Sequence, residues 1–305
     1  MPAVIHGAEV TLGRRQLYML PTRFGLTFAL LIFVLLLASI NYSNGLAYGL
    51  TFLLAAMAVV SMLHTHRNLS RLRLVSGYTE PVFAGEFARF PLWVHNDRGP
   101  LRLDVDFEQR RVVAARSNIP PGGQARVYLG VRSERRGYLP MPAFRVATRF
   151  PLGLLYSWSR GIQLEQHCLV YPRPGAARAL PTGADEYMGR EPVRRGDGDD
   201  FAGLRQFRTG DPPQHVNWKA VAAGRGMYTK EFKGGGLDVV WFDWDRLDGL
   251  EDEARLSQLC RWILDAEQEG LNYGLRLPAL TLAPANGPAH RHACLRALAL
   301  FPRIP

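Results

Sequence analysis

The sequence predicts a chain in three parts: a two-helix transmembrane hairpin, an all-β sandwich and a truncated α/β region. Two long uncharged apolar runs, 24–40 and 45–63, lie close together near the start. Short segments of strand character between turn formers fill the middle, and an order of strand, helix, strand, helix closes the chain. With 305 residues, 47% of them hydrophobic, the chain can bury two modest cores beside a membrane anchor.

Each apolar run is close to the roughly 20 residues that cross the hydrocarbon core of a bilayer. Only residues 41–44 separate the two runs. A cleavable signal peptide is the alternative for the first run, but no small-residue cleavage site follows it and the second run begins almost at once. We therefore expect a transmembrane helical hairpin over 24–63 rather than a signal peptide or a buried soluble hairpin.

Arginines flank the predicted hairpin on both sides, whereas its turn carries no charge. They are Arg14, Arg15 and Arg23 before it and Arg67, Arg71 and Arg73 after it. By the positive-inside rule, both flanks are cytoplasmic. We expect a multi-pass membrane protein with two spans, a cytoplasmic N-terminal tail at 1–23 and a cytoplasmic C-terminus.

Residues 68–174 contain short segments of strand character that are separated by turn-forming residues. The segments are LRLVSG, FARFPLWVHN, LRLDVDFEQ, ARVYLGVRS, FRVATRF and HCLVYP. In LRLDVDF, alternation predicts that Leu101, Leu103, Val105 and Phe107 share one face. Strands of this number and spacing are typical of an immunoglobulin-like sandwich.

The last part of the chain alternates between strand and helix patterns. Residues 237–243 form a hydrophobic strand that ends in an acid, and 272–277 form a second strand. Helices are expected over 251–270, where Gly270 stops the helix, and over 291–301. This order is a βαβα fragment.

The cysteines Cys168, Cys260 and Cys294 have no short spacing. Their odd number and wide separation argue against a disulfide framework and against a zinc site. Cys260 falls on the expected inner face of the first C-terminal helix. We expect buried thiols in a reducing compartment.

Residues 194–233, here called the block, interleave glycines, acids, bases and aromatics with no helical or strand period. All three lysines of the chain, Lys219, Lys230 and Lys233, fall in it. We expect Arg205 and Asp211 to pair across a turn, and 227–232 to form an exposed strand available for partner docking. The predicted partner surface consists of Arg205, Asp211, Trp218, Lys219, Lys230 and Glu231.

The block also carries a family resemblance. GDGDDFAGLRQFRTGDPPQHVNWKAVAAGRGMYTKEF, at 196–232, closely resembles the signature of the domain-of-unknown-function 58 family, and RRGYLPMPAFRVATRFPLGLLYSW, at 135–158, resembles a second family element. The resemblance implies a C-terminal von Willebrand A-like half-domain over the α/β region, so that 190–305 hold the block and this half-domain. It also implies a protein of the bacterial inner membrane with a MoxR-type AAA+ ATPase as partner. We give RFPLGL at 149–154 a structural role, fixing the sandwich against the next part of the chain.

A complete von Willebrand A-like domain binds a divalent cation through an Asp-x-Ser-x-Ser motif that ends its first strand. Here Asp243 begins the corresponding stretch, while Asp245 and Leu247 occupy the two serine positions. Leucine has no atom that can ligate a cation. The positive charge of Arg246 would compete with a cation for the neighbouring carboxylates. Asp243 and Asp245 are therefore weak metal candidates. We expect them to cap the next helix or pair with Arg246, and we expect no metal and no cofactor.

The function expected from these observations is a membrane-anchored, non-catalytic adaptor or scaffold that engages the ATPase and a membrane protein client. The net charge of +10 invites nucleic-acid binding, but the basic residues are spread along the chain, so we expect no nucleic-acid partner. The chain lacks the common hydrolase and phosphate-binding motifs. The alternative is a metal-assisted hydrolase that uses the acids and the histidine near the block. Its candidates are Asp197, Asp199, Asp211, His215 and Asp243.

Overall fold

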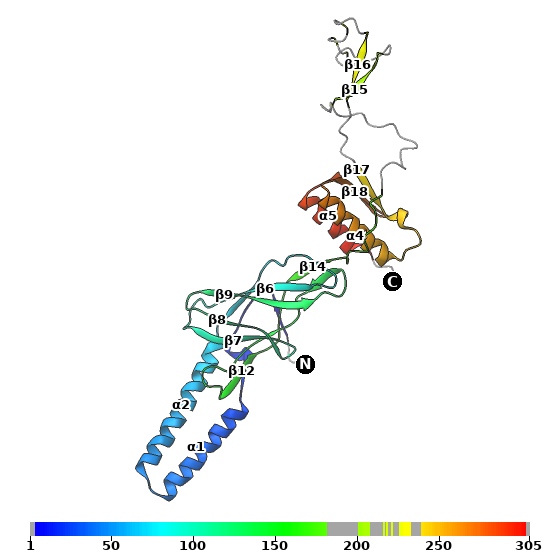
Figure 1. Cartoon of the computed structure of the whole chain (residues 1–305). Helices are drawn as coiled ribbons and strands as arrows, with labels where there is room; N and C mark the ends of the chain where they lie inside the picture. Colours follow the sequence, from blue (N-terminus) through cyan, green and yellow to red (C-terminus); the bar gives the residue numbers. More distant parts are fainter. Residues whose placement is uncertain are drawn as a thin grey trace. The chain divides into compact units, whose positions relative to one another are not determined.

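The structure is a computed structural model that describes residues 4–181, 201–207, 216, 218, 221, 226–232 and 239–302 (Figure 1). The chain divides into two compact units. The first unit comprises residues up to Arg173 together with Pro302, and the second unit spans Pro174–Phe301.

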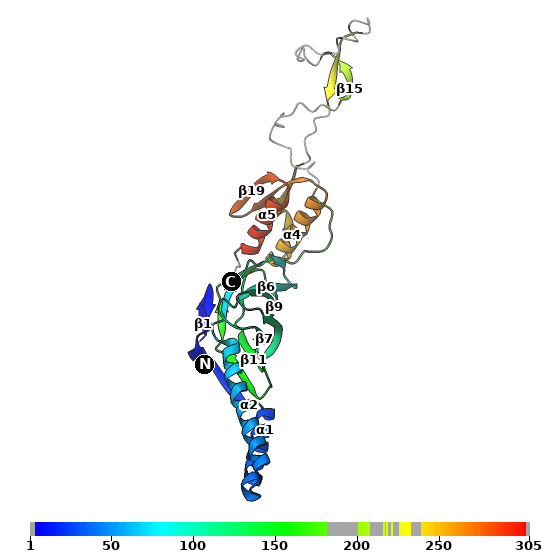
Figure 2. The same ribbon diagram turned by 90° about the vertical axis from the view of Figure 1, so that its left-hand side faces the viewer.

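The first unit contains two long apolar helices, α1 (Arg23–Asn41) and α2 (Gly45–Leu69). Both are long and apolar enough to cross a membrane, as the sequence predicts. The Thr22 hydroxyl caps α1 by accepting from the Gly25 amide, and the Asn44 side chain caps α2. The helices lie side by side in both views, joined by a short turn (Figure 1 and Figure 2).

Helix α2 is longer than the apolar run that predicts it. Its last residues, His64 to Leu69, continue the helix into the β region, where Thr65, Asn68 and Leu69 are buried. The Thr65 hydroxyl donates to the Phe150 carbonyl at 2.8 Å. Helix α2 is therefore packed into the β region at its C-terminal end, whereas the rest of the helix is apolar and exposed.

The β region is built mainly from two antiparallel sheets. One has the order β2-β4-β6-β9 and the other has the order β3-β12-β11-β7-β8. The strands of the first sheet are β2 (Glu9–Thr11), β4 (Arg73–Ser76), β6 (Phe87–His95) and β9 (Gln124–Arg132). Those of the second are β3 (Leu17–Pro21), β7 (Arg102–Gln109), β8 (Val112–Ile119), β11 (Arg145–Thr148) and β12 (Leu155–Ser159).

Two smaller sheets complete the region. The order β10-β14-β5 joins three strands, and β1 pairs with β13 in parallel. Their bounds are β1 (Ile5–Gly7), β5 (Val82–Phe83), β10 (Gly137–Pro140), β13 (Ile162–Leu164) and β14 (His167–Tyr171). Side chains from both larger sheets, such as Phe90, Leu92, Phe107 and Val146, join one buried core.

The expected N-terminal tail at 1–23 contributes three strands to the β region, β1, β2 and β3, between residues 5 and 21. Strand β2 pairs with β4, and β3 pairs with β12 in the register Tyr18↔Trp158. Val10 and Leu12 lie in the core. Whether a short segment forms a strand depends on the strand with which it pairs as well as on its own residue pattern. Here the partner strands lie far along the chain.

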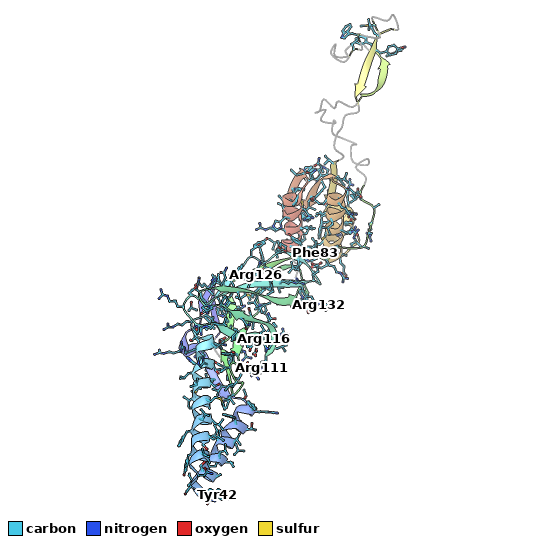
Figure 3. The ribbon with its side chains drawn as sticks, turned by 60° about the vertical axis from the view of Figure 1, so that its left-hand side comes forward. Tyr42, Phe83, Arg111, Arg116, Arg126 and Arg132 are labelled. Carbon is cyan, nitrogen blue, oxygen red and sulfur yellow. The ribbon has the colours of Figure 1, made fainter. Side chains whose placement is uncertain are left out.

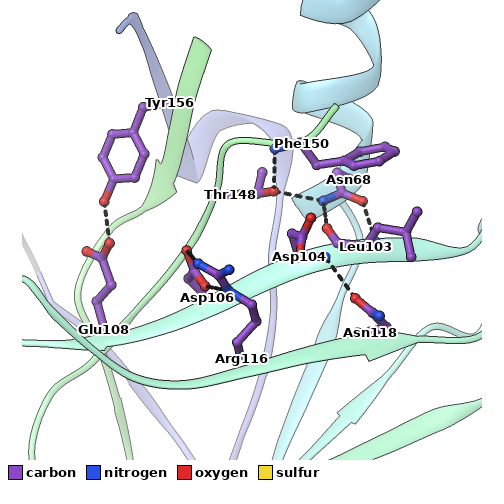
Figure 4. Close-up of polar contacts among 10 residues, drawn as sticks. All are labelled: Asn68, Leu103, Asp104, Asp106, Glu108, Arg116, Asn118, Thr148, Phe150 and Tyr156. Atoms are coloured by element: carbon purple, nitrogen blue, oxygen red, sulfur yellow. Dashed lines mark hydrogen bonds and ion pairs between the residues drawn. The ribbon is translucent and has the colours of Figure 1, made fainter. Parts of the chain in front are cut away.

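The predicted common face of LRLDVDF holds only in part. Val105 and Phe107 are buried in the core, but Leu101 is 47% exposed. A β-bulge between Arg102 and Val105 interrupts the alternation, and Asp104 has a φ of 48°. The side chain of Asn68, from the end of α2, bonds both backbone groups of Leu103 at this bulge (Figure 4).

The RFPLGL segment has the expected structural role, but it holds the helices that precede it in the chain. The Thr22 hydroxyl donates to the Gly153 carbonyl at 2.6 Å, directly before α1. A Cβ added to Gly25 would lie 2.0 Å from the Leu154 carbonyl oxygen. Because backbone meets backbone at this point, only glycine fits there.

The second unit contains a three-stranded sheet with the order β17-β18-β19 and two long helices. Its elements from Val239 onward are β17 (Val239–Asp243), η4 (Trp244–Leu247), α4 (Asp252–Gln268), β18 (Asn272–Leu277), β19 (Leu280–Ala285) and α5 (Pro288–Leu300). The predicted strands and helices are all present, and β17 and β18 are parallel. Antiparallel β19 was not predicted. All three cysteines are buried thiols, as expected.

We predict that Gly25→Ala lowers the free energy of unfolding of the first unit by about 1–3 kcal/mol, because its methyl group would overlap the Leu154 carbonyl. Gly49→Ala is the matched control, since nothing lies within 4 Å of a Cβ at that position of α2. Thermal unfolding of the full-length protein in detergent measures both. Equal midpoints for the two variants would contradict the close contact.

Candidate functional site

The predicted partner surface is described only in part. Strands β15 (Phe201–Gln206) and β16 (Tyr228–Phe232) form a two-stranded antiparallel sheet. Its register pairs Arg205 with Thr229, Leu204 with Lys230 and Gly203 with Glu231. Three of the predicted residues therefore share one ribbon.

The remaining residues of that surface lie between the two strands in the sequence. Trp218 is 58% exposed, which agrees with a surface role. Asp211 and Lys219 lie outside the described residues. The expected pairing of Arg205 with Asp211 accordingly stays a prediction.

Of the two metal candidates, Asp243 has structural partners for both carboxylate oxygens. Asp243 caps the short helix η4, its Oδ1 accepting from the Asp245 amide at 3.1 Å, so the expected capping is confirmed for Asp243. Its Oδ2 lies 3.7 Å from Nη1 of Arg276, whose guanidinium stacks on the Trp241 ring. Among the described residues, no three His, Cys, Asp or Glu side chains gather in a way that could hold a metal ion.

A pocket of about 770 Å³ opens in the first unit, on the outer face of the five-stranded sheet. Its walls are mainly aromatic and basic. They include Tyr18, Tyr156, Trp158, Arg111, Arg145 and Arg149. Leu20, Pro21 and Thr22, the residues that lead from β3 into α1, also line it. The pocket therefore adjoins the start of the first apolar helix.

The aromatic wall is a ladder of three rings across two neighbouring strands. Tyr18 on β3 stacks on Trp158 of β12 at a centroid distance of 5.9 Å, and Trp158 stacks on Tyr156 at 5.2 Å. Tyr18 and Trp158 are direct cross-strand partners, while Tyr156 lies two residues from Trp158 on the same face. The Arg149 guanidinium lies 5.0 Å from the centre of the Tyr156 ring.

Glu108 organises the polar side of the pocket. The Tyr156 hydroxyl donates to Glu108 Oε1 at 2.7 Å, and Arg145 Nη2 lies 3.6 Å from Oε2 (Figure 4 shows the tyrosine contact). The glutamate is only 5% exposed, so both contacts offset the cost of burying its charge. Burial and the bond to Glu108 raise the pKa of Tyr156 to about 12.

Sequence reasoning missed this pocket because its walls come from separate parts of the chain. Tyr18 lies in the expected tail, and Trp158 ends the segment 135–158, in which the sequence predicts no site. A local signal was nevertheless present in LLYSWSRG, where the aromatic residues Tyr156 and Trp158 alternate with serines. The pairing of this segment with β3 through the register Tyr18↔Trp158 required the fold.

We predict that Tyr156→Phe removes a phenolate absorbance step near pH 12. Because the folded protein raises this pKa above the ordinary value of 10.0, the contribution of Tyr156 to stability is complete below pH 10 and declines as the pH rises toward 12. Spectrophotometric titration follows the step. In Glu108→Gln the step should move toward pH 10, and loss of a step near pH 10 on Tyr156→Phe would contradict the assignment.

No family model, curated protein or solved structure matches this chain. The resemblance drawn from the block therefore stays an expectation, and the site is interpreted from its own geometry.

Proposed function

We propose that this protein is a membrane-anchored, non-catalytic adaptor or scaffold. It would cross the bacterial inner membrane twice and act with a MoxR-type AAA+ ATPase in the assembly, maturation or remodelling of protein complexes. The observation that carries the proposal is a pair of exposed apolar helices whose ends are hydrogen-bonded to a folded β region. An adaptor needs this combination of an anchor and a fixed platform.

The anchor follows from the apolar surface that the helices expose. Only 6% of the apolar window of α1 and 11% of that of α2 are buried inside the protein. Large side chains such as Leu30, Phe33 and Phe52 are more than half exposed. Such a surface is unfavourable in water and is expected to be covered by lipid.

The orientation rests on charge. Arg23 begins α1, Arg67 lies in the last turn of α2, and residues 42–44 between the helices are uncharged. The positive-inside rule then favours cytoplasmic placement of the β region and of both termini.

The adaptor interpretation is favoured over a metal-assisted hydrolase by the state of Asp243. Its carboxylate already caps η4 and faces Arg276, so a cation would have to displace an arginine. The other acids and the histidine considered for a hydrolase, Asp197, Asp199, Asp211 and His215, lie outside the described residues.

The ATPase contact is proposed from the resemblance of the block and from the ribbon that it contains. In the part of the chain that the structure describes, β15 and β16 pair only with each other, so each leaves one edge open. Open edges bind extended partner segments by strand addition. The exposed Trp218 adds an aromatic side chain of the kind that dominates protein interfaces.

Two finer fold assignments belong to the same proposal. We propose an immunoglobulin-like arrangement for the two larger sheets, supported by their common core. We propose a von Willebrand A-like origin for the second unit, supported by parallel β17 and β18 joined through α4.

We predict that Tyr42→Cys, at the far end of the helical hairpin (Figure 3), reacts with a membrane-impermeant maleimide in intact spheroplasts. Tyr42 is 78% exposed in the turn that should lie outside the cytoplasm. The native thiols should stay silent, because they are buried and burial raises the pKa of each. Glu134→Cys, on the β region, should react only after lysis. The reverse pattern would overturn the orientation.

We predict that affinity capture of the tagged full-length protein from crosslinked, gently solubilised membranes recovers an AAA+ ATPase. The variant Arg205→Ala/Trp218→Ala/Lys219→Ala, shown by circular dichroism to remain folded, should recover less than a tenth as much, because it removes an aromatic side chain and two cations from the proposed contact.

The matched control replaces an exposed aromatic residue and two exposed arginines on the β region, as Tyr78→Ala/Arg89→Ala/Arg132→Ala. It should capture as much ATPase as the wild type. Absence of an ATPase from all three samples would reject the adaptor proposal, and equal loss from both variants would reject the block as its contact.

A further inference from the structure

The pocket beside α1 carries more positive than negative charge. Three arginines line it, Arg111, Arg145 and Arg149, against one carboxylate, that of Glu108. Glu108 is engaged by Arg145 and by the Tyr156 hydroxyl. Arg111 and Arg149 are exposed, and no described ion pair joins either of them to a carboxylate. Two guanidinium groups are therefore available to an anionic ligand, for which arginine provides a fork of donors.

The mouth of the pocket is apolar on the side of the helix. Leu20 is 59% exposed and Tyr18 is 40% exposed on β3. Their surface leads to Phe24 and Leu26 in the first turn of α1, which are 59% and 58% exposed. Aromatic rings with polar tips are typical of the boundary between membrane and water. A ligand that fits this surface has an anionic head and an apolar tail.

We propose that this pocket binds the phosphate-bearing headgroup of an anionic phospholipid from the membrane that α1 and α2 enter. The inference rests on the membrane anchoring in the proposed function and adds a specific ligand to it. Arg111 and Arg149 bind the phosphate, the ladder of Tyr18, Trp158 and Tyr156 forms the wall beside the headgroup, and Leu20 contacts the first part of an acyl chain.

A lipid headgroup explains the site better than a free phosphate ester does. A soluble phosphate ester would use the arginines but would leave Leu20, which lines the pocket and is 59% exposed, without an apolar partner. The position of the pocket at the entry to α1 brings a bilayer headgroup within its reach without a further conformational step. Bound lipid would hold the β region at a defined height on the membrane.

The test uses full-length protein purified in an uncharged detergent and native mass spectrometry. Phosphatidylglycerol, phosphatidylcholine and glycerol 3-phosphate are titrated separately. The pocket variant is Arg111→Gln/Arg149→Gln. The matched control is Arg126→Gln/Arg132→Gln, which also removes two exposed arginines of the first unit (Figure 3), one of them stacked on aromatic rings. Thermal unfolding checks that both variants are folded.

We expect the wild type to bind phosphatidylglycerol at least tenfold more tightly than phosphatidylcholine. The pocket variant should weaken phosphatidylglycerol binding by about thirtyfold, since each basic residue near an anionic surface contributes about a factor of five, while the control should change it by less than about threefold. Equal effects of the two variants, or equal binding of the two lipids by the wild type, would overturn the proposal. Binding of glycerol 3-phosphate as tight as that of phosphatidylglycerol would assign the pocket to a soluble phosphate ester instead.

A separate measurement distinguishes failure of the lipid site from failure of the anchor. Native membranes that contain each protein are washed with alkaline carbonate. Release of the wild type into the supernatant would reject the membrane anchoring itself. Retention of all three proteins, together with unchanged lipid binding by the pocket variant, would reject only the headgroup site.

Discussion

The hydrogen bonds of Asn68 join the helical hairpin to the β region, and the rest of the first unit depends on this junction. Its side-chain amide donates to the Leu103 carbonyl at 2.7 Å and accepts from the Leu103 amide at 3.1 Å. One side chain thus replaces the neighbouring strand at a bulge where the ladder is interrupted. Without it, two backbone groups would lose their partners, at a cost of about 1–3 kcal/mol for each buried group.

The junction extends from Asn68 to both helices through one loop. Asn68 also donates to the Thr148 hydroxyl, which accepts from the Phe150 amide. The Phe150 carbonyl in turn accepts from Thr65 of α2, and two residues of the same loop, Gly153 and Leu154, accept from Thr22 at the start of α1. The loop after β11 therefore binds the two helices at their entry to the β region and holds them in place relative to one another.

The same connections place the aromatic and basic residues of the pocket beside the hairpin. Strand β3 enters α1 directly, and its partner β12 comes directly after the loop that binds α1. Any arrangement that docks the helices in this way brings Tyr18 and Trp158 together next to the first apolar turn. The buried carboxylates on that face are balanced locally, with Asp106 2.6 Å from Arg116 and Glu108 3.6 Å from Arg145. The arginines without such partners are then available to a ligand.

The sequence by itself determined the elements whose signal is local. The apolar runs predict α1 and α2, short segments of strand character between turn formers predict β4, β6 and β9, and the helical period that buries Cys260 predicts α4. Tertiary structure alone decided the strands at 5–21, the bulge at Leu103 and the pocket. In each case the deciding partner lies far away in the chain: Trp158 for Tyr18, and Asn68 for Leu103. Strand pairing and side-chain hydrogen bonds across such separations depend on the whole fold, because a local residue pattern does not indicate which distant segments become neighbours.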